Sequence, residues 1–197
     1  FVTELGSAIH QHQKILSVTV YAKTSENSNW TGPGAQDWSV LVNQADSLKI
    51  MAYDYHWVTS NPGPISPLDW LQDILAYART IPGAKGKIIV GLPFYGIDWG
   101  TVGKEVMYQD AIGILSRYTY AGYSRDSVGG VTNAEIHFTY NDSGISHSVY
   151  FQDRTALRER LKVISQYRDI VKGVTFWHLG GEDPGNWNEL KNYQSKP

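Results

Sequence analysis

One short stretch of the chain, Met51-Ala-Tyr-Asp-Tyr-His-Trp57, gathers most of the side chains that could do chemistry. It closes an apolar run that begins at Leu48, and such a run is typical of a buried parallel strand whose carboxyl end opens into a site. Asp54 offers a carboxylate, and the amphipathic rings beside it can stack on a sugar or another flat ligand. The plainer alternative is a strand-end Asp54 that caps a loop above a packed Tyr53.

Two further strands end in side chains of the same kinds. The run Lys87–Gly96 ends in Phe94-Tyr95, and the run Gly173–Gly180 contains Trp177. In a parallel barrel the carboxyl ends of all strands lie on one face, so residues far apart in sequence converge there. We therefore expect the three strand ends to form one site, although Trp177 could instead be a core residue.

The elements predicted around these strand ends alternate between helix and strand. They are a helix from Phe1, a strand over 14–24, a helix over 37–44, a strand over 48–53, a helix over 66–79, a strand over 87–96, a helix from Asp153, a strand over 173–180 and a helix over 184–193. Strands joined by helices through short links form βαβ units with a parallel sheet. Four such strands make half of a (β/α)8 barrel, and four more strands are needed to close it.

The region between about Ile97 and Phe151 interrupts this alternation. Alternating apolar patterns cover residues 134–140 and 147–151, and Asn141-Asp-Ser-Gly144 between them has the composition of a hairpin turn. A Gly129-Gly130 turn precedes them. We predict a small insertion that contains antiparallel strands.

Composition excludes several classes of function. A net charge of −2 and a pI near 6.3 provide no basic surface for nucleic acid or an anionic membrane. The chain has no cysteine and its six histidines lack ligand spacing, so we expect no metal site. It contains no phosphate-binding loop, so no nucleotide cofactor is expected. No apolar run approaches the roughly 18 residues of a membrane span.

Taken in order, four motifs resemble one known family. They are Met51-Ala-Tyr-Asp-Tyr-His-Trp57, Gly63-Pro-Ile-Ser-Pro67, Gly91-Leu-Pro-Phe-Tyr-Gly96, and Gly173-Val-Thr-Phe-Trp-His-Leu-Gly180 with Glu182-Asp-Pro184. Together they resemble the second half of the catalytic barrel of glycoside hydrolase family 18, in the chitinase-like form of the bacterial spore-cortex and LysM-associated glycosidases. The resemblance covers nearly the whole chain and implies an α/β fold, the C-terminal half of a (β/α)8 TIM barrel.

The resemblance also implies where the domain boundaries fall. Residues 1–96 would run from barrel helix 4 to strand 7. Residues 97–152 would be a small α+β insertion between the seventh strand and its helix. Residues 153–197 would supply helix 7, strand 8 and helix 8.

The family's mechanism implies roles for the matched residues, because these enzymes use the acetamido group of the substrate itself as the nucleophile. Tyr53 would hydrogen-bond the acetamido oxygen, and Asp54 would position the acetamido nitrogen and stabilise developing positive charge. Trp177 would form the apolar floor beneath the reacting sugar. The remaining substrate contacts would come from Met51, Tyr95, Trp57 and Asp98. The partner would be an oligosaccharide or polysaccharide, either chitin or peptidoglycan.

One part of the family pattern is missing from the sequence. The catalytic acid of the family lies in an Asp-x-x-Asp-x-Asp-x-Glu run, and no such run occurs here. Because the predicted helix at Phe1 also starts without a cap, we expect the catalytic acid and the first strands to lie upstream of residue 1. Half a barrel exposes strand edges, so we expect it to need the missing N-terminal half or a second copy for stability.

The resemblance suggests a secreted location, or one in the cell envelope or spore. Two alternatives to a glycosidase stay open. One is a non-catalytic, lectin-like relative that binds the same glycans in the same groove. The other is a half-barrel module whose role is assembly.

Overall fold

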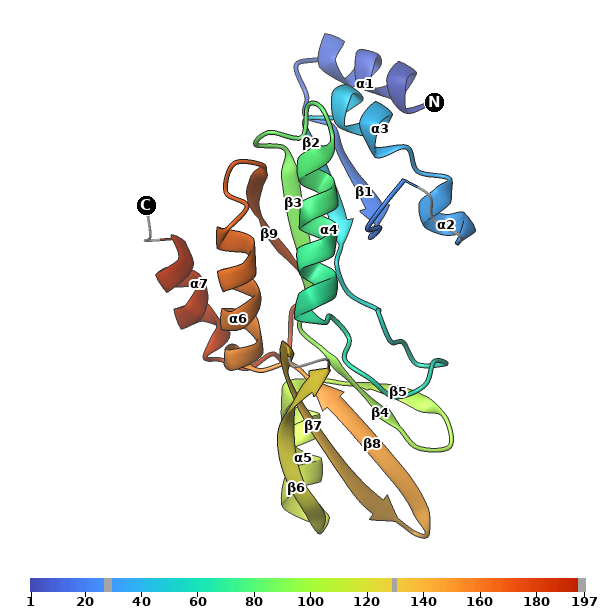
Figure 1. Ribbon diagram of the computed structural model, residues 1–197, viewed down its shortest axis with the longest axis vertical. Helices are drawn as coiled ribbons and strands as arrows, with labels where there is room; N and C mark the ends of the chain where they lie inside the picture. The colour runs from blue at the N-terminus through green and yellow to red at the C-terminus, as the bar shows by residue number, and fades with distance from the viewer. Residues whose placement is uncertain (27–29, 129–130, 195–197) are drawn as a thin grey trace. The chain divides into compact units, whose positions relative to one another are not determined.

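The computed structural model describes residues 1–26, 30–128 and 131–194 (Figure 1). The predicted Gly129-Gly130 turn lies outside these residues. The chain divides into two compact units, which we describe separately. The first unit consists of Phe1–Ala52, Trp70–Leu92 and Ile164–Thr175, and the second of Tyr53–Asp69, Pro93–Val163 and Phe176–Pro197.

A four-stranded sheet forms the centre of the first unit, in the order β1-β2-β3-β9. Its strands are β1 (Ser17–Tyr21), β2 (Ser47–Met51), β3 (Ile88–Pro93) and β9 (Val171–Trp177). The pairs β1–β2 and β2–β3 are parallel, with Val20, Ile50 and Val90 fully or almost fully buried. The four predicted barrel strands are thus present as one sheet, and the continuation of this sheet into a closed barrel stays a prediction.

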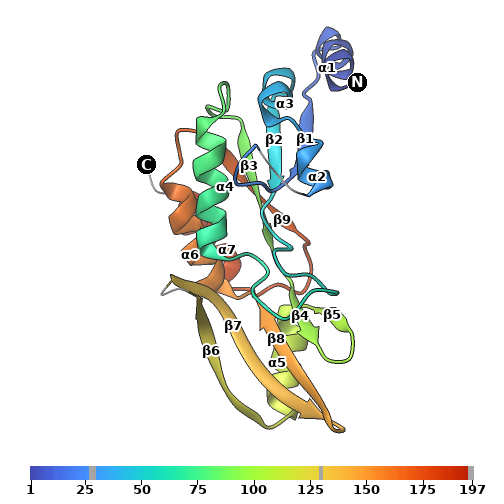
Figure 2. The same cartoon turned by 45° about the vertical axis from the view of Figure 1, so that its right-hand side comes forward.

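Three helices of this unit lie at the predicted positions, namely α1 (Val2–Gln11), α3 (Trp38–Gln44) and α4 (Leu68–Thr80). The short helix α2 (Thr31–Gly34) was not predicted. Asp37 caps α3, because its Oδ1 accepts the backbone N–H of Val40 at 3.0 Å. Helix α4 runs alongside β3 (Figures 1 and 2) and buries the residues of its apolar face, namely Leu71, Ile74, Leu75 and Ala78.

The second unit contains an antiparallel sheet in the order β5-β4-β8-β7-β6 (Figure 2). Its strands are β4 (Gly96–Trp99), β5 (Gly103–Val106), β6 (Tyr120–Val128), β7 (Val131–Asp142) and β8 (Ile145–Phe151). Strands β7 and β8 form the predicted hairpin, in which the Asn141 side chain accepts the backbone N–H of Gly144 at 3.0 Å. The strand pairs of this sheet are antiparallel.

Helix α5 (Tyr108–Arg117), which was not predicted, covers one face of this sheet. Ala111 of α5 packs in one apolar cluster with Phe138 of β7 and with Phe151 of β8. The opposite face of the sheet carries Ile97, Trp99 and Tyr150, which belong to a second cluster. One face of this sheet is thus covered by α5, and the opposite face carries the second cluster.

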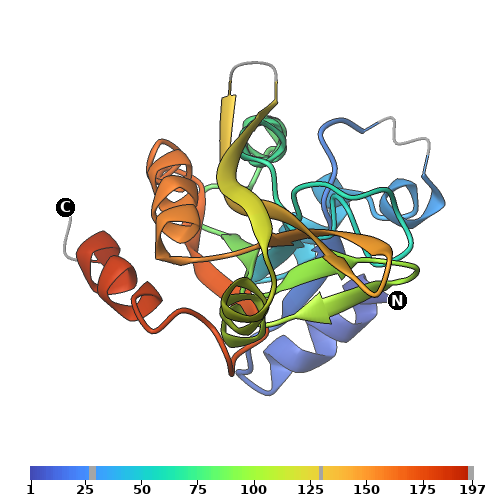
Figure 3. The ribbon, with the colours of Figure 1, turned by 90° about the horizontal axis from the view of Figure 1, so that it is seen from below.

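Two further helices close the chain, α6 (Arg154–Ser165) and α7 (Asn186–Gln194). They lie side by side (Figure 3), joined by an ion pair of 3.6 Å between Arg158 and Glu189. As predicted, Asp153 caps α6 by accepting the backbone N–H of Ala156 at 2.9 Å. None of the helices within the described residues combines the length and the apolar character that crossing a membrane requires.

Candidate active site

The loop that follows β2 is anchored inside the second unit by a buried carboxylate. Glu135, which is fully buried, accepts the backbone N–H groups of Ile65 and Ser66, each at 2.8 Å. The buried Arg160 pairs with the same carboxylate at 2.5 Å and also donates to the Ser66 carbonyl. Because a buried charge is stable only when it is paired and hydrogen-bonded, this arrangement fixes the Gly63-Pro-Ile-Ser-Pro67 motif in one place.

The same loop is closed near its start by backbone pairing. The N–H of Tyr55 donates to the Ile65 carbonyl at 2.9 Å, and the His56 ring contacts the Pro64 carbonyl at 2.9 Å through Nδ1. Asp54 has a φ of +60°, a left-handed conformation that is uncommon for residues other than glycine. Such conformations cluster at functional sites, where the surrounding structure holds them.

Asp54 is joined directly to the end of the next strand. The hydroxyl of Tyr95 donates a hydrogen bond to Asp54 Oδ1, and the rings of Tyr53 and Tyr95 meet edge to face with centroids 6.4 Å apart. Tyr95 is buried, Tyr53 is half-buried and Asp54 is exposed as a whole residue. The structure therefore brings together three of the residues that the sequence predicted for the site.

The environment of this cluster disfavours negative charge. Desolvation raises the pKa of Asp54, the hydrogen bond from Tyr95 opposes that rise, and the charge of Glu105 adds to it. Desolvation, followed by the bond to Asp54, raises the pKa of Tyr95 well above its ordinary value. The pKa of Tyr53 is also raised, by desolvation and then by the charge of Asp54. Both tyrosines are consequently neutral hydroxyl donors at neutral pH.

Trp177, at the end of β9, adjoins the strand end that carries Tyr95. The N–H of Phe94 donates to the Trp177 carbonyl at 2.7 Å, and the rings of Phe94 and Phe176 stack with centroids 4.1 Å apart. Trp177 is 55% exposed as a residue, and its assignment as the floor of the site stays a prediction.

Glu105 and His178 form an acid–base pair that was not predicted from the sequence. Glu105 of β5 lies 2.8 Å from His178 Nε2, and this bond is the main cause of a raised pKa of His178. The negative charge of Glu105 also raises the pKa values of Asp54 and Tyr95, so Glu105 interacts electrostatically with both residues. Glu105 lies in a short strand with no motif around it, so no sequence signal pointed to it.

The other predicted contacts are placed differently. Trp57 is 49% exposed, and its indole N–H donates to Thr59 Oγ1 at 2.8 Å. Asp98 is buried and accepts a hydrogen bond from the Tyr140 hydroxyl at 2.6 Å. Its other carboxylate oxygen lies 2.8 Å from His147 Nδ1. The structure does not bring Asp98 to the cluster, and a role for it in substrate binding stays a prediction. Met51 is the half-buried last residue of β2 and belongs to the first unit.

The arrangement can polarise, orient and stack a ligand without a bound ion. Within the described part of the chain, no three Asp, Glu or His side chains gather into a cluster that could hold a metal. The chemistry available is a carboxylate of raised pKa, two neutral tyrosine hydroxyls and an exposed indole. These groups suit a neutral ligand with apolar faces and hydrogen-bonding substituents, such as a sugar.

Comparison with known proteins gives a consistent result. The model of the family Glycosyl hydrolases family 18 matches residues 1–183. A cortical fragment-lytic enzyme of Bacillus anthracis is 27% identical, over 89% of this chain and 41% of that protein. A chitinase of Chromobacterium violaceum superposes with a TM-score of 0.86 at 27% identity, covering 100% of this chain and 60% of that one.

A second solved structure extends the comparison to spore enzymes. The spore cortex-lytic enzyme SleL of Bacillus cereus superposes with a TM-score of 0.85 at 26% identity, covering 96% of this chain and 44% of that one. The chain therefore spans less than half the length of the cortex-lytic relatives that it matches.

Proposed function

Because the chain belongs to glycosyl hydrolase family 18, we propose that the protein cleaves β-1,4-linked glycans containing N-acetylglucosamine, chitin or peptidoglycan, with retention and with the substrate's acetamido group as nucleophile. The observation that carries this proposal is the direct hydrogen bond between Tyr95 and Asp54, with Tyr53 against Tyr95. The names of the relatives support the substrate class, since they refer to cortical fragments, the spore cortex and chitin.

In this proposal each residue of the cluster acts on a different part of the reacting sugar. The Tyr53 hydroxyl donates to the acetamido oxygen and orients it for attack on the anomeric carbon. Asp54 accepts from the acetamido N–H and stabilises the positive charge that develops on the group. Tyr95 holds the Asp54 carboxylate in place, and Trp177 supports the apolar face of the ring.

The proton donor of the reaction belongs, in our proposal, to a part of the protein outside these 197 residues. The sequence contains no Asp-x-x-Asp-x-Asp-x-Glu run, and Glu105 and Glu182 lie in no such pattern. The leaving-group oxygen must be protonated in a retaining glycosidase, so a general acid is required for the complete reaction. The names of the spore-cortex relatives further support a location in the cell envelope or the spore.

The test is substitution of the two residues that contact the acetamido group, in the full-length natural protein. We expect Tyr53→Phe and Asp54→Asn each to lower kcat by roughly tenfold to a thousandfold on chitin oligomers or cortex peptidoglycan, the range for loss of one transition-state contact. Matched controls are Tyr123→Phe and Asp73→Asn, which make the same chemical changes at exposed residues on β6 and α4.

The outcomes separate the candidate functions. Wild-type turnover in both site variants would contradict the assignment of Tyr53 and Asp54. A natural protein that binds these glycans without any turnover would instead be the lectin-like relative, since it would lack a working general acid.

A further inference from the structure

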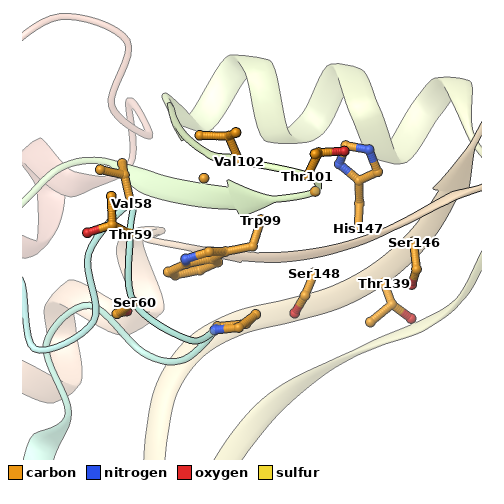
Figure 4. A pocket seen from close by; sticks show the side chains of 13 residues that line it. Val58, Thr59, Ser60, Trp99, Thr101, Val102, Thr139, Ser146, His147 and Ser148 are labelled. Atoms are coloured by element: carbon orange, nitrogen blue, oxygen red, sulfur yellow. The ribbon is translucent and has the colours of Figure 1, made fainter.

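Two charged side chains of the second unit, Glu135 and Arg160, are too deeply buried to touch a ligand. Glu135 is fully buried, Arg160 is 1% exposed, and the two form an ion pair of 2.5 Å. Neither is among the described residues that line the pocket of this unit (Figure 4). Any contribution of the pair to function must therefore act through the residues that it holds.

The ion pair is expected to add little stability by itself. The cost of taking two charges out of water largely offsets their attraction, so replacing a buried pair by neutral residues is often without effect or stabilising. The Nε of Arg160 is also buried without a hydrogen-bond partner among the described residues. The pair does impose geometry, because carboxylate and guanidinium groups bond along fixed directions.

Two hydrogen bonds from Glu135 impose this geometry on the loop after β2. One carboxylate oxygen accepts the N–H of Ile65 and the other accepts the N–H of Ser66, each at 2.8 Å. The Ile65 carbonyl in turn accepts the N–H of Tyr55 at 2.9 Å. Because Tyr55 directly follows Asp54, only Ile65 and one backbone hydrogen bond separate the Glu135 carboxylate from the backbone next to Asp54.

The side chain of Ile65 provides a second connection to Asp54. Ile65 is fully buried in one apolar cluster with Tyr95, and Tyr53 packs against that cluster. The Tyr95 hydroxyl donates to Asp54 Oδ1. Ile65 is thus connected to Asp54 through its main chain, by way of Tyr55, and through its side chain, by way of Tyr95.

The backbone on both sides of Glu135 is itself bonded. Arg125 of β6 donates to the Ala134 carbonyl at 2.6 Å and pairs with Asp153, the cap of α6, also at 2.6 Å. Ile136, which follows Glu135 in β7, is paired with both neighbouring strands. The Glu135 carboxylate is therefore a fixed point to which the loop is attached.

The backbone conformation of Asp54 explains why the loop needs such an attachment. Its φ of +60° lies in the left-handed region, which residues other than glycine seldom adopt and which persists only where the surrounding structure holds it. If the loop were released from Glu135, this conformation would relax. The Asp54 carboxylate would then turn away from the direction that the Tyr95 bond now gives it.

We propose that Glu135 and Arg160 are positioning residues of the reaction, which hold the Asp54 carboxylate in the geometry that the transition state requires. The inference rests on the proposed function, because it acts through the role that Asp54 has there. Neither residue contacts the substrate, so an effect of either on turnover must pass through Asp54.

The test is a double-mutant cycle in the full-length natural protein. The pair variant Glu135→Gln/Arg160→Met leaves no unpaired charge inside, and its one amide oxygen replaces two carboxylate oxygens as acceptor. It is combined with Asp54→Asn, and kcat and KM are measured on chitin oligomers or cortex peptidoglycan, whichever the wild type cleaves. Glu189→Gln, which removes the ion pair with Arg158 between α6 and α7, is the control.

We expect the pair variant to lower kcat by about tenfold or more with KM changed by less than about twofold, because a displaced Asp54 loses a contact made only in the transition state. In the Asp54→Asn background the same change should lower kcat by less than about twofold, since the carboxylate that it positions is already absent. The control should behave as the wild type. An unchanged kcat in the pair variant, or an equal loss in both backgrounds, would overturn the proposal.

Hydrogen exchange in the unsubstituted protein tests the attachment of the loop even if the pair variant fails to fold. The amides of Tyr55, Ile65 and Ser66 should exchange as slowly as those of β7, because freeing them requires breaking the buried ion pair. Fast exchange of these three amides beside a protected β7 would also overturn the proposal.

The same measurements separate this inference from the proposed function. If the wild type cleaves the glycan and Asp54→Asn impairs cleavage, but the pair variant does not, only the positioning role fails. If the wild type cleaves neither glycan, or Asp54→Asn has wild-type turnover, the proposed function fails and the positioning role fails with it.

Discussion

At the scale of single residues, the candidate site is a set of acids whose ionisation is coupled. Desolvation raises the pKa of Asp54, the hydrogen bond from the Tyr95 hydroxyl lowers it in part, and the charge of Glu105 raises it further. In our proposal Asp54 acts as the carboxylate, so its pKa sets the lower pH limit of activity. Glu105 then tunes that limit, although it makes no contact with the reacting atoms in our scheme.

We therefore expect Glu105→Gln to shift the acidic limb of the kcat/KM profile toward lower pH. Removing the charge of Glu105 takes away one of the causes that raise the pKa of Asp54, so the carboxylate forms at lower pH. The profile is measured on a soluble chitin oligomer, with Glu159→Gln on α6 as the control. An acidic limb that does not move, or moves upward, would contradict this role.

The same variant should change the titration of His178. Its pKa is raised mainly by the hydrogen bond with Glu105, so the protonated form should be lost at lower pH once that bond is removed. NMR titration of the ring reports this directly. The two readings together distinguish an electrostatic role for Glu105 from a purely structural one.

At the scale of elements, close backbone approaches decide how the insertion sheet is joined to the site. Gly96 follows Tyr95 directly and begins β4, which pairs with β8. A Cβ at Gly96 would lie 2.2 Å from the Tyr150 carbonyl oxygen and 2.6 Å from Phe151 Cα, both of which are backbone atoms. Neither atom can move aside as a flexible side chain could, so the strand pairing itself depends on this glycine.

We predict opposite effects for two glycine-to-alanine substitutions in this unit. Gly96→Ala should lower the free energy of unfolding by about 1–3 kcal/mol, because the methyl group forces β4 and β8 apart. Gly113→Ala, inside α5 where the new Cβ meets no packed neighbour beyond the helix's own backbone, should raise it by up to about 1 kcal/mol through helix propensity. Denaturant unfolding of both variants measures this, and equal effects would contradict the packing argument.

At the scale of the whole molecule, the parallel sheet of the first unit has two edge strands, β1 and β9. Unpaired strand edges are a template for association, and all-parallel sheets almost always have both faces covered. Large apolar side chains are also exposed on the first unit, among them Phe1 at 89%, Ile15 at 75% and Trp30 at 62%. These features agree with the prediction that further strands extend this sheet into a barrel.

Expressed alone, the 197 residues should therefore self-associate or fold poorly. Sedimentation analysis should find dimers or larger species, and adding the further strands that the predicted barrel requires should convert them to a monomer that unfolds cooperatively. A monomeric, cooperatively folding preparation of these residues alone would contradict this expectation.

Much of the fold followed from local patterns. The four strands of the first sheet, the helices with apolar faces, the Asp153 cap and the hairpin at residues 141–144 lie where the sequence predicted them. These features depend on periodicity and on the chemistry of neighbouring residues, which a sequence displays directly. Helix α5 has a clear apolar face, and it was missed because the mixed patterns of residues 97–151 were assigned to antiparallel strands.

The sequence by itself determined the α/β order and the residue types Tyr53, Asp54, Tyr95 and Trp177 at strand ends. Only the tertiary structure decided their partners. It bonded Tyr95 to Asp54, buried Asp98 between Tyr140 and His147, and brought Glu105 to His178. The physical reason is distance along the chain, since these pairs are 41 to 73 residues apart and no local pattern encodes which strands meet.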